Sequence, residues 1–146
     1  MLSINLVRII VLALYLFVVS IIDIKYKSLS VFLVILGIIM MSILYIFSPY
    51  NIYSLLGGIA VGIIVILISF ITKEAIGIGD GMILIIIGLG VGASTIYIFL
   101  YSLIVLSICA TLFIIVRKKN YKLEIPMIPF YFIGVIFQIF YDKTIL

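Results

Sequence analysis

The chain has 146 residues, of which 68% are hydrophobic and only 10% charged, and its mean hydropathy is +1.62. A soluble domain is about half apolar and about a quarter charged, so this composition excludes a water-soluble protein and predicts a membrane-embedded one. The net charge of +4 is better explained by membrane topology than by a nucleic-acid partner.

A helix needs about 20 apolar residues to cross the hydrocarbon core. Short polar segments divide the chain into such runs, and the glycine-rich stretch 90–95 divides a run that is too long for one crossing. We therefore predict an all-α, polytopic membrane protein, with residues 1–146 forming a single transmembrane domain. About six transmembrane helices are expected, over 4–22, 29–47, 52–71, two within 81–116, and about 125–140.

The basic residues predict the orientation of these helices. Cytoplasmic loops of membrane proteins carry an excess of lysine and arginine. With the N-terminus outside, only Arg8, expected to snorkel outward, and Lys143 lie outside. The remaining basic residues then face the cytoplasm: Lys25, Lys27, Lys73, Arg117, Lys118, Lys119 and Lys122. We expect a multi-pass plasma-membrane protein with both termini outside.

The third predicted helix carries Gly58 and Gly62, four residues apart. Small residues at this spacing let two membrane helices approach closely. We interpret them as a helix-packing surface with no direct role in chemistry.

The reactive side chains are few. The chain contains no histidine, and its single cysteine, Cys109, excludes an internal disulfide and a multi-cysteine zinc site. Nucleophiles activated by histidine are therefore impossible, and we expect neither a metal nor a cofactor. Any catalysis must use carboxylates, lysines, hydroxyls or the backbone.

Two of the five acidic residues occupy unusual positions. Asp23 ends the first predicted helix, and Asp80 opens the fourth within the segment 77–81. The predicted topology places both at the same membrane face, where ionised groups are costly to bury and commonly functional. The other acidic residues are Glu74, Glu124 and Asp142.

A pair of carboxylates suits peptide hydrolysis. At close range one keeps a proton while the other is ionised, so one activates a water and the other polarises the scissile carbonyl. The residues alone leave two alternatives open. Asp23 is also typical of a cytoplasmic flank paired with Lys25 or Lys27, and Asp80 of a helix N-terminus favoured by the helix dipole.

Three motifs, in order, resemble the prepilin peptidases, also called type IV leader peptidases. The segment Gly77-Ile78-Gly79-Asp80 resembles their GxGD motif. The segment around Asp23-Ile24-Lys25 is similar to their first aspartate motif, which follows a helix and has basic neighbours. The segment 124–130, Glu-Ile-Pro-Met-Ile-Pro-Phe, is similar to the Ile-Pro-x-x-Pro-Phe element that opens their last helix.

The resemblance implies a GxGD aspartic protease fold in which Asp23 and Asp80 are catalytic. It implies cleavage of the leader of a prepilin-like protein, of type IV pilin or Tad type, at the cytoplasmic face. The partners would be this substrate and membrane lipid. Residues expected to bind substrate or shape the site are Gly77, Gly79, Lys73 and Glu74.

The chain also departs from the family pattern. Members often have lysine two residues after the second aspartate, where this chain has Met82. The cysteine-paired N-terminal portion of bifunctional members is absent, so we expect peptidase activity without N-methylation. Two alternative functions are a small transporter whose aspartates carry protons or cations, and an inactive scaffold homologue.

Overall fold

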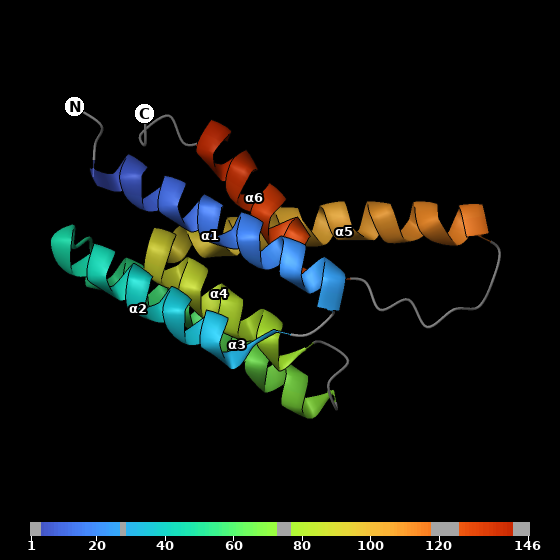
Figure 1. The fold of residues 1–146 in the computed structure, drawn as a ribbon, viewed down its shortest axis with the longest axis horizontal. Helices are drawn as coiled ribbons and strands as arrows, with labels where there is room; N and C mark the ends of the chain where they lie inside the picture. The colour runs from blue at the N-terminus through green and yellow to red at the C-terminus, as the bar shows by residue number, and fades with distance from the viewer. Residues whose placement is uncertain (1–3, 27–28, 73–76, 118–125, 142–146) are drawn as a thin grey trace.

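The computed structural model describes residues 4–26, 29–72, 77–117 and 126–141. Within these ranges the chain is all-α, as predicted, with six α-helices and one short 3₁₀ helix (Figure 1). The elements are α1 (Ile4–Tyr26), α2 (Val31–Phe47), α3 (Ile52–Ile71), α4 (Ile78–Val91), η1 (Gly92–Ser94), α5 (Thr95–Arg117) and α6 (Ile128–Tyr141).

Three helical segments of the described chain are long and apolar enough to cross a membrane. They are Asn5–Tyr26, Ile52–Ile71 and the α4–α5 stretch Ile78–Phe113. Helices α2 and α6 are apolar but shorter, with 17 and 14 residues. The chain thus has the helices of a membrane protein, and the expectation of six separate crossings stays a prediction.

Four helix ends differ from the predicted bounds by two or more residues: the end of α1 and the starts of α2, α4 and α6. Helix α1 continues through Asp23 to Tyr26, because nothing in this segment breaks a helix and polar residues are tolerated at its end. Helix α6 begins at Ile128, later than expected. Pro129 then lies in its first turn, where the missing N–H interrupts no helical hydrogen bond.

The predicted break between the fourth and fifth helices is confirmed at Gly92. This residue has φ +63°, in the left-handed region that favours glycine. The hydroxyl of Thr95 donates to the Gly92 carbonyl at 2.7 Å, and the Ala93 N–H donates to Ser54 Oγ of α3 at 3.0 Å. The chain therefore leaves the axis of α4 here, and α5 runs in a new direction (Figure 1).

Helices α3 and α4 pack at backbone distance through glycines, as Gly58 and Gly62 predicted. A Cβ added to Gly62 would lie 2.6 Å from the backbone nitrogen of Ile85 and 2.8 Å from the carbonyl oxygen of Gly81. One added to Gly88 would lie 2.5 Å from the carbonyl carbon of Gly58. No side chain fits between the two helices at these positions.

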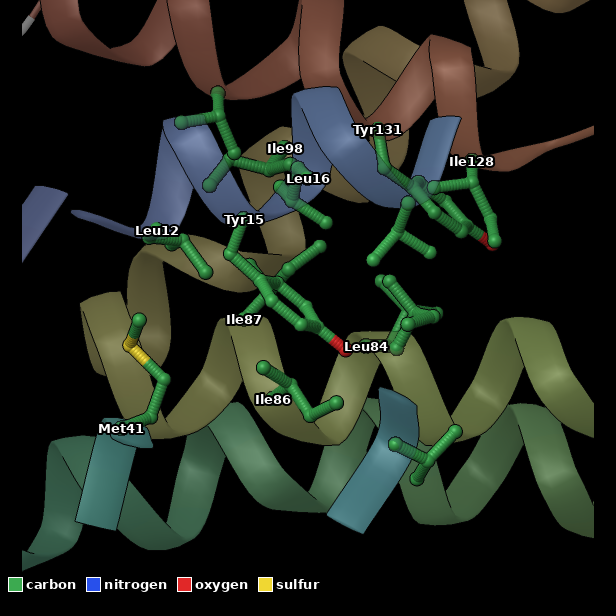
Figure 2. Close-up of a cluster of buried hydrophobic side chains, with 14 of the residues drawn as sticks. Leu12, Tyr15, Leu16, Met41, Leu84, Ile86, Ile87, Ile98, Ile128 and Tyr131 are labelled. Atoms are coloured by element: carbon green, nitrogen blue, oxygen red, sulfur yellow. The ribbon is translucent and has the colours of Figure 1, made fainter. Parts of the chain in front are cut away.

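Helix α4 lies at the centre of the bundle, with α1, α2, α3 and α5 packed against it. Its side chains Ile83, Leu84, Ile86 and Ile87 are fully buried. They form one apolar core with residues from the surrounding helices, many of which Figure 2 shows: Leu12, Tyr15, Leu16, Met41, Ile98, Ile128 and Tyr131. The position of α4, and of Asp80 in its first turn, is therefore fixed from several sides.

The Arg8 side chain is only 6% exposed, so it does not snorkel outward as expected. Its guanidinium donates to the Ser48 carbonyl at 2.9 Å and lies 4.5 Å from the centre of the Tyr50 ring. The Tyr50 hydroxyl in turn donates to the Gly88 carbonyl at 2.9 Å. Burial raises the pKa of Tyr50 to about 12, so it remains a donor at neutral pH. These contacts join α1, the α2–α3 turn and the C-terminal half of α4.

The substitution Gly62→Ala tests the packing of α3 on α4. We expect it to lower the free energy of unfolding by about 1–3 kcal/mol, the usual cost of overpacking, because the added methyl meets backbone atoms of α4. Gly57→Ala on the same helix is the matched control, since its Cβ would meet only the Ala93 Cβ at 3.7 Å. Thermal unfolding in detergent measures both, and equal midpoints for the two variants would contradict the packing described.

Candidate active site

Asp23 lies in the last turn of α1 and is only 9% exposed. Its Oδ2 accepts a hydrogen bond of 3.4 Å from the backbone N–H of Ile128, the first residue of α6. The first N–H groups of a helix have no partner within the helix, and they carry its positive partial charge. The start of α6 therefore supplies a favourable environment for the Asp23 carboxylate.

Asp80 is the third residue of α4, after the N-cap Gly77. Its backbone N–H donates to the Gly77 carbonyl at 3.0 Å, and its carboxylate accepts a backbone hydrogen bond from Gly77. A side chain at the third position that returns to the N-cap amide is one half of a capping box. The GxGD segment thus forms a helix start in which the aspartate bonds to the first glycine.

The structure brings Asp23 and Asp80 together. Both carboxylates line one pocket with a volume of about 310 Å³, and they are close enough to interact electrostatically. The pocket lies where the end of α1, the start of α2 and the start of α4 meet. Its other lining residues are Leu29, Val31, Val34, Gly77, Ile78, Gly79 and Met82.

Helix α2 and the residues before it supply an apolar wall that the sequence analysis did not identify. Leu29, Val31 and Val34 line the same pocket as the two aspartates. Nothing in the sequence distinguishes them from the lipid-facing residues of a membrane helix. A Cβ added to Gly79 would lie 2.9 Å from Leu29 Cδ1, so the bare backbone at Gly79 makes room for this wall.

The remaining predicted site residues have different outcomes. Gly77 and Gly79 line the pocket, whereas Lys73 and Glu74 lie outside the described residues. Met82, where prepilin peptidases often have lysine, lines the pocket and is 39% exposed. This edge of the pocket is therefore apolar.

The alternative reading of Asp23 as a partner of Lys25 is not what the structure shows. The Lys25 ammonium lies 5.2 Å from the centre of the Tyr26 ring, and Asp23 bonds to the Ile128 amide. Lys27 and Glu124 lie outside the described ranges. Among the residues that are described, no three acidic, histidine or cysteine side chains form a group that could hold a metal ion.

Comparison with known proteins identifies the family. A model of the type IV leader peptidase family matches residues 10–116, a range that includes both pocket aspartates and most of the chain. No curated protein and no solved structure matches this chain. The chain belongs to the type IV leader peptidase family, as its motifs predicted.

Proposed function

We propose that this member of the type IV leader peptidase family is an aspartic endopeptidase whose catalytic groups are Asp23 and Asp80. The observation that carries the proposal is the meeting of these two carboxylates in one pocket, although they come from different helices. Membership of the family supports a prepilin-type leader peptidase in general. The assignment of the two residues rests on their geometry.

The pair would act by general acid–base catalysis. Two neighbouring carboxylates cannot both ionise easily, so one holds a proton while the other is charged. The charged carboxylate takes a proton from a water as its oxygen attacks the scissile carbonyl carbon. The protonated carboxylate donates to the carbonyl oxygen. When the resulting gem-diol collapses, the carboxyl group that took the water's proton gives it to the leaving nitrogen, a diol hydroxyl returns its proton to the other aspartate, and the C–N bond breaks.

The volume and lining of the pocket are compatible with a peptide substrate. Ligand pockets commonly start at about 300 Å³, so this one admits a short stretch of peptide rather than a whole leader. Gly77 and Gly79 bring main-chain atoms to the pocket lining, and an extended substrate strand would approach the backbone there. We propose that Lys73 and Glu74, which precede Gly77 in the chain, contribute to substrate binding beside it.

The setting of the reaction follows from the basic residues. Lys25, two residues after Asp23, belongs to the set that the positive-inside rule assigns to the cytoplasm. We infer a plasma-membrane protein of six crossings with its termini outside and its pocket at the cytoplasmic face. Its substrate would be a prepilin-like precursor of type IV pilin or Tad type, cleaved without subsequent N-methylation.

Replacing either aspartate by asparagine tests the pair. Asp23→Asn and Asp80→Asn keep the shape of the side chain but remove the group that exchanges a proton. Each is expected to abolish leader cleavage, or to lower it by about 100-fold or more. The measurement is the gel mobility shift of a co-expressed prepilin-like protein from the same genome.

Asp142→Asn is the matched control, because it makes the same chemical change in the C-terminal tail. It should cleave at the parental rate, and all variants should retain the parental thermal midpoint in detergent. Cleavage that survives either pocket substitution would rule out a two-aspartate mechanism. If no candidate precursor is cleaved by the parent, the transporter and scaffold alternatives regain weight.

The substitution Gly79→Ala tests whether the apolar wall shapes the site. The added methyl would displace Leu29, the flexible side chain it meets, so stability should change little. Cleavage should slow by about 10- to 100-fold, because small displacements of a bound substrate have large effects on rate.

The double variant Gly79→Ala, Leu29→Ala provides the control for this effect. It removes the side chain that the methyl displaces, and cleavage should recover relative to Gly79→Ala alone. Single Leu29→Ala completes the cycle. A parental rate in Gly79→Ala, or no recovery in the double variant, would contradict this account of the wall.

A further inference from the structure

Tyr131 on α6 carries a buried polar group that the fold does not explain. Its side chain has no exposed surface, and among the described residues its hydroxyl has no hydrogen-bond partner. Two other tyrosine hydroxyls donate hydrogen bonds of 2.9 Å to backbone carbonyls far away in the sequence, Tyr15 to Leu33 and Tyr50 to Gly88. Buried polar groups are nearly always paired, because leaving one unpaired costs free energy.

The position of Tyr131 relates it to the pocket. Tyr131 lies one helical turn after Ile128, and residues three apart share a face of a helix. Figure 2 shows the two side chains next to each other on α6. The backbone N–H of Ile128 donates to Asp23, and the Tyr131 phenol is close enough to Asp80 to interact with it electrostatically. The first turn of α6 therefore carries one group that bonds to Asp23 and another that interacts electrostatically with Asp80.

Tyr131 is absent from the pocket lining, which consists of residues from the end of α1, the start of α2 and the start of α4. Its ring instead belongs to the apolar core around α4. A group placed in this way would reach the Asp80 carboxylate without touching a bound substrate.

Asp80 has room for another donor. A carboxylate can accept about four hydrogen bonds, and Gly77 supplies a backbone bond to this one. A phenol is a neutral donor, so it could occupy one of the remaining acceptor positions of this carboxylate. A second donor would fix the orientation of the Asp80 carboxylate relative to Asp23.

We propose that Tyr131 is a positioning residue, whose hydroxyl donates to the Asp80 carboxylate in the reactive complex and holds it in line with Asp23. This proposal rests on the function proposed above and extends it to a third side chain. Tyr131 acts through Asp80 and exchanges no proton with the substrate.

The competing explanation is that the ring of Tyr131 fills the core and its hydroxyl does nothing. Tyr131→Phe separates the two, since it keeps the ring and removes only the oxygen. Tyr50→Phe is the matched control, because it removes a phenol oxygen that bonds to Gly88 in the C-terminal half of α4, away from the pocket. Both variants are purified in detergent and assayed with a peptide that spans the leader junction.

Tyr131→Phe should lower kcat by about 10-fold or more, with KM and the thermal midpoint unchanged. Tyr50→Phe should lower the thermal midpoint and leave kcat unchanged, because the bond it loses is structural. An unchanged kcat in Tyr131→Phe would overturn the proposal, and so would a fall in kcat accompanied by an equal loss in the Tyr50→Phe control. Asp80→Asn is assayed in parallel, so that a failure of the two-aspartate mechanism is recognised separately.

Discussion

Helix α4 can occupy the centre of this bundle because α3 approaches it at backbone distance. Gly58 and Gly62 of α3 face glycines of α4, and any side chain between them would meet backbone atoms. Large apolar residues on the other faces of α4 fill the space toward α1, α2, α5 and α6. With α4 held on all sides, the position of Asp80 in its first turn is decided by packing along the whole helix, rather than by contacts within the pocket.

Among the described residues that line the pocket none is basic, so the two carboxylates depend on other groups for electrostatic stabilisation. Carboxylates are costly to place among apolar groups, and two of them repel each other. Each aspartate here accepts a bond from a backbone amide at the start of a helix, Asp23 from α6 and Asp80 from its own α4. Helix N-termini carry a positive partial charge that favours an anion. Backbone groups thus make the close approach of two acids tolerable.

The sequence predicted the features that depend on strong local signals. Composition and the lengths of the apolar runs predicted an all-α membrane protein, and the bounds of α3 agree with prediction because polar or turn residues flank it. The glycines at 58, 62 and 92 predicted close packing and a break in the chain. The three motifs together, in family order, predicted the family, which the comparison with known proteins confirms.

Other features could not be predicted because their signals are not local. Leu29, Val31 and Val34 have the composition of any membrane helix, and only their position opposite the aspartates distinguishes them. The burial of Arg8 could not be predicted because it depends on the Ser48 carbonyl and the Tyr50 ring, some 40 residues away in the chain. The hydrogen bond from Ile128 to Asp23 joins residues 105 positions apart and uses a backbone donor, so no residue type in the sequence predicts it.

This last bond has a consequence for how the site can change over evolutionary time. A donor on a side chain would tie position 128 to a few residue types, whereas a main-chain amide is supplied by every residue except proline. Any residue at this position whose volume suits the core preserves the bond. We therefore expect position 128 to tolerate a change of residue type, provided that the helix still begins there and the side chain fits the core.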